Sequence, residues 1–237
     1  MNRHSVAKIV VPPMPPAAAV RPKTVRAARP RARAAAPRGD KRDAILRAAI
    51  RTFARSGFFG AQVADVARTA GVAAGTVYLY FRSKDDLLVS IFERVMTEAI
   101  AEGRAALSGI ADPLERLRRI AHLHLDRLSR DRDLAIVFQV ELRQTTKFME
   151  RFSNTLLREY LGILRDAIAD GQAAGVVRPG VNPTLAAKML FGALDEMATN
   201  WMLSRRRTSL DGVADAVVDM FVNGVGTPAR TAVGGRP

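Results

Sequence analysis

The stretch Gln62–Lys84 (QVADVARTAGVAAGTVYLYFRSK) constrains the fold of this chain more than any other. At the 3.6-residue period of an α-helix, its first part gathers four apolar side chains on one face: Val63, Val66, Ala67 and Ala70. Gly71 then interrupts the pattern, as a residue that readily takes a positive φ does at a helix C-terminus. A second segment, Ala74–Phe81, places Val77 and Phe81 one turn apart. Two short helices joined by a tight turn predict a helix-turn-helix, whose second helix can enter the major groove of DNA.

The outward side of the second helix lacks the lysines and glutamates of an ordinary surface helix. Gly75 costs roughly 1 kcal/mol of helix propensity relative to alanine, but it leaves room for a DNA backbone. Thr76 can hydrogen-bond a phosphate or a base edge, and tyrosine hydroxyls can reach phosphate oxygens. The alternative is that the tyrosines only pack against the head, and it applies most to Tyr78. The predicted DNA contacts on this helix are Ala74, Gly75, Thr76, Tyr78, Leu79 and Tyr80.

A further predicted DNA contact opens the next helix. Ser83 and Asp86 have the spacing of a capping box, which predicts that a helix begins at Lys84. A lysine in a first turn is unfavourable for the helix dipole alone. Beside DNA, its ammonium and the free N–H groups of the helix end form a phosphate site together. We therefore add Lys84 to the predicted DNA contacts.

These residues resemble the signature of TetR-type transcriptional regulators. The matching positions are Gly71 to Phe81 (GVAAGTVYLYF), Lys84, Asp86 and Leu87. The helix before them, Arg42–Ser56 followed by Gly57 and Phe58, resembles the first helix of the same family. Ala73 departs from the pattern, because the family often has Ser or Thr there. We therefore expect the second helix to lack a side-chain cap.

Composition narrows the class of protein. A chain of 237 residues is long enough for two small domains, and 48% apolar residues permit a sizeable core. No stretch approaches 18 consecutive apolar residues, so we expect no membrane span. Cysteine is absent, which excludes a disulfide framework and a thiolate nucleophile. This composition fits the reducing cytoplasm, where we expect the protein to reside.

Residues 1–39 form a separate regime, with nine basic residues, seven prolines and no acid. Such a segment cannot bury enough apolar surface to offset its ordering entropy, so we predict a disordered basic arm. The arm either raises DNA affinity without specificity, through counterion release, or is an uninvolved tail. Removing its nine charges from the net +14 leaves +5 for residues 40–237, so the remainder is only mildly basic.

All other segments carry helical signals, and the expected fold class is all-α. We predict a helix-turn-helix DNA-binding domain over 40–83, a helical ligand-binding and dimerisation domain over 84–224, and a loose C-terminal end over 225–237. Within these domains the expected helices cover about 41–56, 84–107, 113–129, a segment after 131, 147–174, 183–203 and 209–222. Asp112 and Asn182, each followed by proline, are expected to be N-caps.

The last two expected helices have apolar faces that must be buried against another part of the protein or a second copy. Small residues on them would let helices approach closely, so the pair can meet a second copy in a four-helix interface. The alternative is that they cap the core of their own subunit. Helix-turn-helix proteins generally need two heads about 34–36 Å apart, which favours a homodimer on a palindromic operator. TetR-like regulators typically dimerise through their final two helices. The candidate interface residues are Met189, Gly192, Ala193, Met197, Val217, Met220 and Phe221.

The second domain resembles a narrower group, the TetR-type FadR regulators of fatty acid degradation. The matching blocks are 134–137 (LAIV), 141–144 (ELRQ), 160–164 (YLGIL), 191–192 (FG), 195–196 (DE) and Trp201. The resemblance covers roughly 41–224. It implies a repressor that binds long-chain acyl-CoA and then releases DNA.

Apolar side chains of this domain can line a channel for an acyl chain, or they can form an ordinary filled core. Arg143 or Arg158 can hold a CoA phosphate by a forked hydrogen bond, or can pair with a surface acid. The candidate ligand-binding residues are Phe138, Leu142, Arg143, Gln144, Arg158, Leu161 and Trp201.

Catalysis finds little support, and no cofactor or metal is expected. His122 and His124 lie two residues apart, so on a helix they face different sides and cannot share a metal ion. His122 and Asp126 lie one helical turn apart and can form a pair, which is more often structural than catalytic. Three hypotheses remain: a dimeric repressor that responds to acyl-CoA, a TetR-type regulator that responds to another lipophilic compound (as in control of drug efflux), and an acyl-CoA enzyme in which the helical pair is only structural.

Overall fold

The computed structural model describes residues 38–144, 155–204, 209–210 and 212–225. Almost all of the basic arm, the residues 147–154 expected to be helical and the C-terminal end from 226 onward lie outside these ranges. Every element in the described part of the chain is a helix, which confirms the all-α class.

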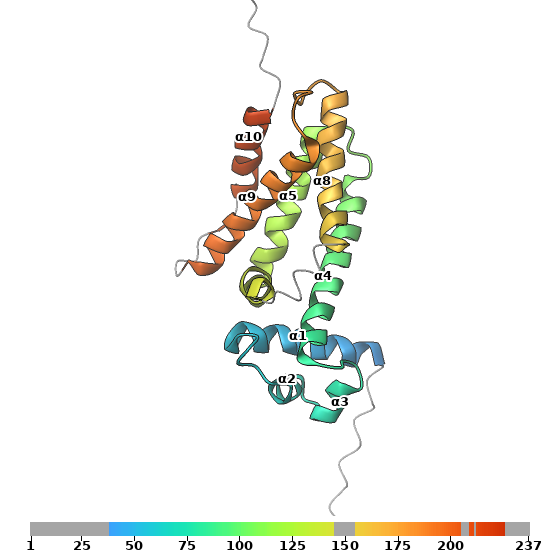
Figure 1. Cartoon of the computed structure of the whole chain (residues 1–237), viewed down its shortest axis with the longest axis vertical. Helices are drawn as coiled ribbons and strands as arrows, with labels where there is room; N and C mark the ends of the chain where they lie inside the picture. The colour runs from blue at the N-terminus through green and yellow to red at the C-terminus, as the bar shows by residue number, and fades with distance from the viewer. Residues whose placement is uncertain (1–37, 145–154, 205–208, 211, 226–237) are drawn as a thin grey trace, which may run out of the picture. The chain divides into compact units, whose positions relative to one another are not determined.

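The helix-turn-helix head consists of α1 (Arg38–Ser56), α2 (Val63–Ala70) and α3 (Ala74–Tyr78). Figure 1 shows α2 and α3 next to α1, and α1 makes its main head contacts with α2. The core of the head consists of side chains that are at most 2% exposed, among them Ile45, Phe53, Val66, Val77 and Phe81. The apolar faces read from the sequence therefore point inward.

Two details of the head follow from local chemistry. Gly71 has a φ of +70° and ends α2, as expected. The second helix ends at Tyr78, three residues before the predicted end at Phe81. The N–H groups of Leu79 and Tyr80 bond to carbonyls three residues back, which tightens the last turn.

The remaining helices form a bundle. They are α4 (Lys84–Leu107), α5 (Pro113–Arg130), α6 (Arg132–Ile136), α8 (Leu156–Ala173), α9 (Pro183–Leu203) and α10 (Val213–Val225). The predicted N-caps are confirmed: oxygens of Ser83, Asp112 and Asn182 accept first-turn N–H groups at 3.1, 2.9 and 3.0 Å. Figure 1 shows α8 beside α4, and α8 also contacts α5 and α9.

The structure differs from the sequence-based expectation at two further helix boundaries. The last helix begins at Val213, not at Ser209, because Gly212 has a φ of +74° that an α-helix cannot contain. After α6 the chain does not continue as an α-helix. It forms a π-helical turn, η1 (Val137–Glu141), and a 3-10 turn, η2 (Leu142–Gln144). Such π turns are rare and occur frequently at functional sites.

The turn after α1 is held from two sides. The backbone N–H of Phe58 donates to a carboxylate oxygen of Glu141 in η1 at 2.6 Å, and Glu141 is only 6% exposed. From α4, the ammonium of Lys84 donates to the carbonyls of Phe59 and Ala61 at 3.1 and 3.0 Å. The same ammonium lies 4.7 Å from the centre of the Phe58 ring. The position of this turn therefore depends on both α4 and η1.

Replacing Glu141 by alanine is expected to destabilise the protein by about 1–3 kcal/mol, because a buried N–H loses its acceptor. Glu141→Gln keeps an acceptor oxygen and should lose less, since only the charge is removed. Urea unfolding at fixed protein concentration, followed by the fluorescence of the single tryptophan, measures both effects.

Hydrogen exchange at the Phe58 amide gives the local test. Exchange should be fastest in Glu141→Ala, and Glu93→Ala, at an exposed acid on α4, should leave it unchanged. An equally slow Phe58 amide in Glu141→Ala would contradict the assignment of the carboxylate as its acceptor.

Candidate DNA-reading surface and effector cavity

The outward side of α3 is open. Ala74 and Gly75 are exposed, Tyr78 is 56% exposed and Leu79 is 82% exposed. Thr76 and Tyr80 are half-buried at the edges of this surface. An exposed fraction of 56% does not fit the alternative in which Tyr78 only packs against the head. The helix also lacks a side-chain cap, because Ala73 occupies its N-cap position.

The ammonium of Lys84 makes hydrogen bonds within the head that the sequence did not indicate. Its ammonium carries three donor hydrogens. Hydrogen bonds to the carbonyls of Phe59 and Ala61 use two of them inside the head. One donor remains for a phosphate. Phe59 itself is 65% exposed beside this lysine, and sequence reasoning did not single it out.

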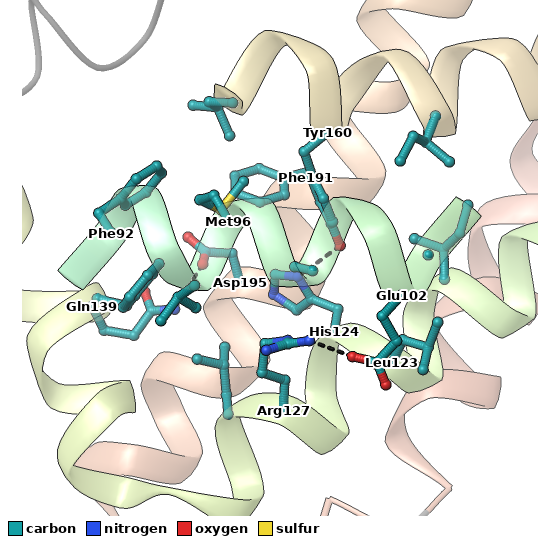
Figure 2. Close-up of a pocket in the computed structure, with 18 of the residues that line it drawn as sticks. Phe92, Met96, Glu102, Leu123, His124, Arg127, Gln139, Tyr160, Phe191 and Asp195 are labelled. Atoms are coloured by element: carbon teal, nitrogen blue, oxygen red, sulfur yellow. Dashed lines mark hydrogen bonds and ion pairs between the residues drawn. The ribbon is translucent and has the colours of Figure 1, made fainter. Parts of the chain in front are cut away.

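A cavity of about 420 Å³ lies within the bundle, enclosed by α4, α5, η1, η2, α8 and α9. Its volume falls within the range of roughly 300–1,000 Å³ that is usual for small-molecule sites. Most of its wall is apolar, and the rings of Phe92 and Phe138 stack in it with centroids 5.3 Å apart. Other apolar lining residues are Val95, Met96, Ile120, Leu123, Leu157 and Phe191. Figure 2 shows the polar side chains that interrupt this wall.

Three of the seven candidate ligand residues line the cavity: Phe138, Leu142 and Arg143. Leu161 and Trp201 do not, because Leu161 packs against the core elsewhere and the Trp201 ring lies under the guanidinium of Arg132, 5.7 Å away. Arg158 borders a separate surface groove. The side chain of Gln144 lies outside the described residues.

One polar cluster joins η1 and η2 to α9. The side-chain amide of Gln139 donates to Asp195 at 2.7 Å, and the guanidinium of Arg143 forms an ion pair with the same carboxylate. The hydroxyl of Thr199 donates to the Gln139 oxygen at 3.0 Å. Gln139 and Asp195 are 6% and 9% exposed, so this network ties the π turn to α9 from inside the bundle.

A second set of polar groups lies on α5. Arg127 forms an ion pair with Glu102 on α4 (Figure 2). It also lies 3.7 Å from Glu98 on the same helix. The Nδ1 atom of His124 lies 3.1 Å from the hydroxyl of Tyr160 on α8. Burial lowers the pKa of His124 from 6.5 to about 4, so the imidazole is neutral at physiological pH. Burial also raises the pKa of Tyr160, an effect that nearby Arg127 partly opposes.

The sequence carries a signal for these groups in the stripe of α5. His124 and Arg127 continue the apolar stripe of α5, at the spacing of Ile120, Leu123 and Leu128. Polar residues in a buried stripe indicate partners or a site. His122 is different, because it pairs with Asp215 of α10 at 2.9 Å. Asp126, the other partner that helical spacing allows, lies 3.6 Å from Arg130.

A groove on the surface adjoins the cavity. Four arginines and two acids line it: Arg104, Arg116, Arg158, Arg165, Glu159 and Asp166. Ile163 borders both the groove and the cavity, so the two share a wall on α8. Three of the arginines form ion pairs: Arg104 with Glu159, Arg116 with Asp170 and Arg165 with Asp166. Arginines still outnumber acids along the groove, which lies next to an apolar interior.

On the outer face of the bundle, Met189 and Met220 are 61% and 70% exposed, and Gly192 and Ala193 are exposed as well. Met197 and Phe221 are half-buried. Val217 is only 6% exposed and belongs to the core of its own subunit. It was expected in a subunit interface, but it is not available to a second copy.

A helix-turn-helix head joined to a helical bundle defines a class of protein, the DNA-binding transcriptional regulator. The family description "Bacterial regulatory proteins, tetR family" matches residues 45–91, and "YsiA-like protein, C-terminal region" matches residues 92–224. The chain belongs to the TetR family of bacterial transcriptional regulators.

Several bacterial regulators are similar to most of this chain. The fatty acid metabolism regulator protein of Bacillus subtilis is 34% identical over 181 residues, which is 76% of this chain and 93% of the relative. The solved structure of the fatty acid degradation regulator FadR from Bacillus halodurans is 35% identical, with a TM-score of 0.73, and covers 77% of this chain and 98% of its own. FadR from Bacillus subtilis, solved in complex with stearoyl-CoA, is 34% identical with the same TM-score and coverage.

These relatives are regulators, which agrees with the expectation that the chain is not an enzyme. No helix in the described ranges is both long enough and apolar enough to cross a membrane.

Lowering the pH from 7 to 5 is expected to reduce the free energy of unfolding through His124. The pKa of this histidine is about 4 in the folded chain and 6.5 in the unfolded chain, so the unfolded chain takes up a proton that the folded chain excludes. The contribution is present above pH 6.5 and is lost as the pH falls towards 4. At pH 5 the loss is roughly 2 kcal/mol.

Urea unfolding of the native protein and of His124→Gln at both pH values measures this loss, because the variant should lack it. His122→Gln is the matched control, at a histidine on the same helix whose side chain is 40% exposed. Identical pH dependence in the native protein and in His124→Gln would contradict the burial of a neutral imidazole.

Proposed function

We propose that this chain is a dimeric repressor of fatty acid degradation genes and that long-chain acyl-CoA releases it from its operator. In this proposal, residues 40–83 read DNA, and residues 84–224 bind the effector and form the dimer. The observation that carries the proposal is the apolar cavity with an arginine-lined groove on its flank.

The chemistry of an acyl-CoA matches this pair of sites. Its hydrocarbon chain needs an enclosed apolar space, and its nucleotide carries phosphates that arginine binds well. The cavity supplies the first, and the groove with its four arginines supplies the second. Ile163 lines both, so the two sites are neighbours, and in this proposal one ligand spans them. The stearoyl-CoA bound to the similar Bacillus subtilis FadR supports the same ligand class.

Dimerisation is supported by the exposed apolar side chains on α9 and α10. Exposed Met189 and Met220 lie on these two helices, and exposed Gly192 and Ala193 permit close approach of a second copy. A dimer would present two heads to the two halves of a palindromic operator.

Release of DNA requires that the cavity and the head share a movable element, and η1 has the contacts for this role. Phe138 and Gln139 of η1 line the cavity, while Glu141 accepts the Phe58 N–H of the head. A ligand that repacks η1 therefore changes the support of the turn after α1. Coupling of about 1–3 kcal/mol, which corresponds to 5–150-fold in affinity, is typical of such regulators.

The test is a gel shift on the DNA upstream of the protein's own gene, with and without oleoyl-CoA. Oleoyl-CoA should release the DNA, and it should raise the melting temperature of the protein in the absence of DNA. Lipophilic cations, which represent exported drugs, should do neither. Release by the cations and not by oleoyl-CoA would replace the proposed effector with that second class.

Tyr78→Ala and Thr76→Ala should each weaken operator binding about tenfold, because each removes a side chain from the exposed surface of α3. Affinity for oleoyl-CoA should stay unchanged, since neither residue lies near the cavity. Gel shifts and calorimetry measure the two affinities. Thr184→Ala, at an exposed threonine on α9, is the matched control, and equal loss of both affinities would mean that the domains are wrongly placed.

Arg158→Ala should lower the affinity for oleoyl-CoA about tenfold, because a charged hydrogen bond to phosphate is lost. Affinity for oleoyl-pantetheine, which lacks the nucleotide phosphates, should not change. Arg130→Ala, at an exposed arginine of α5 outside the groove, is the control for a general charge effect. Equal losses for both ligands would place the nucleotide elsewhere.

A further inference from the structure

One buried side-chain nitrogen stands out in the part of the chain that the structure describes. Nε2 of His124 is shielded from water and has no hydrogen-bond partner. His124 lines the cavity, between Tyr160 and Arg127 in Figure 2. Buried polar atoms in folded proteins are nearly always paired, so an unpaired one in a ligand cavity points to a group that the ligand supplies.

The partner on the other ring nitrogen decides what Nε2 can do. Nδ1 lies 3.1 Å from the Tyr160 hydroxyl, which is itself buried. Tyr160 keeps its proton, because burial raises its pKa, and Nδ1 is the acceptor within reach of that proton. The imidazole is neutral, so its one hydrogen is then on Nε2. Nε2–H is therefore a donor in need of an acceptor.

The other polar groups in this wall already have partners. Arg127 is paired with Glu102, and the Asp195 carboxylate holds both Gln139 and Arg143. A polar ligand group that enters the cavity would have to break one of these contacts, whereas Nε2–H of His124 is unengaged.

We propose that His124 is a specificity-determining residue, whose Nε2–H donates a hydrogen bond to the thioester carbonyl oxygen of an acyl-CoA. This inference rests on the proposed function. It names the atom of the ligand that the cavity recognises. Tyr160 acts as a positioning residue, because its hydroxyl fixes which imidazole nitrogen carries the hydrogen.

The location of the pair fits the thioester. Tyr160 lies one turn of α8 before Ile163, the residue that borders both cavity and groove. The thioester is the point at which the hydrocarbon chain of an acyl-CoA joins its polar half. A ligand with its chain in the cavity and its phosphates in the groove has its carbonyl near this junction.

The surroundings favour a neutral acceptor over a charged one. Glu102 and Asp195 line the same cavity, and the rest of the wall is largely apolar. A free carboxylate would be desolvated near two acids whose neutralising arginines are already engaged. A thioester carbonyl accepts the hydrogen bond without bringing a charge, so a free fatty acid is the poorer ligand.

The experiment compares oleoyl-CoA with its thioether analogue, in which a methylene replaces the carbonyl. The native protein should bind oleoyl-CoA about tenfold more tightly, the equivalent of one hydrogen bond. His124→Phe should bind the two compounds equally, and His124→Gln, which restores an amide donor, should recover part of the preference. Calorimetry gives the affinities, and thermal unfolding shows that each variant is folded.

Nitrogen-15 NMR of histidine-labelled protein supplies a readout that a packing role would not move. The native signals should show the hydrogen of His124 on Nε2, with a change at this nitrogen when oleoyl-CoA binds and none when the thioether binds. Tyr160→Phe should mix the two tautomers and lower the preference for the thioester.

Equal binding of both compounds by the native protein would overturn the inference. Nε2–H would then be directed at the ring of Phe191, which stands at 85° to the imidazole with centroids 5.7 Å apart. A preference that survives in His124→Phe would overturn it as well. Failure of both compounds to bind would instead contradict the proposed function. If His124→Phe does not fold, the native comparison and His124→Gln still decide.

Discussion

The hydrogen bond from the Phe58 backbone to the buried carboxylate of Glu141 is the contact on which the regulatory design depends. It joins residues 83 positions apart in the chain, and it brings the bundle to the turn that follows α1. Because a buried acceptor without its donor is unfavourable, head and π turn are expected to move together. The same π turn forms part of the cavity wall, so the geometry of the reading head is tied to what the cavity contains.

The charged groups around the cavity are arranged in closed pairs. Arg143 with Asp195 and Arg127 with Glu102 each bring one positive and one negative charge to the wall. The interior is therefore close to neutral and suits a hydrocarbon chain, while the side chains that line the outer groove include four arginines and two acids. This separation of neutral interior and arginine-rich exterior matches an amphipathic anion better than a lipophilic cation.

The sequence predicted the parts of the fold that local chemistry determines. Ser83, Asp112 and Asn182 cap helices where their side chains and the following residues indicated, and Gly71 ends α2. The π turn was missed, because its buried partners, Phe58 and Asp195, lie far away in the sequence. The cavity was only partly predicted. Helical spacing identifies the side chains that face inward, but it does not tell whether they pack against another helix or line a cavity. His124 was dismissed as a metal ligand, and its role as an unpaired donor depends on Tyr160, which no spacing rule connects to it.

The hollow in the bundle has a consequence for the life of the protein in the cell. Side chains around an empty space lack contacts on one side, so an unliganded chain opens more often than a filled one. Quality-control proteases degrade chains in proportion to how often they open. Under the proposed function, the repressor molecules that acyl-CoA has released from DNA would be degraded most slowly. The cell would then hold a reserve of regulator that can resume silencing without new synthesis once the lipid is consumed.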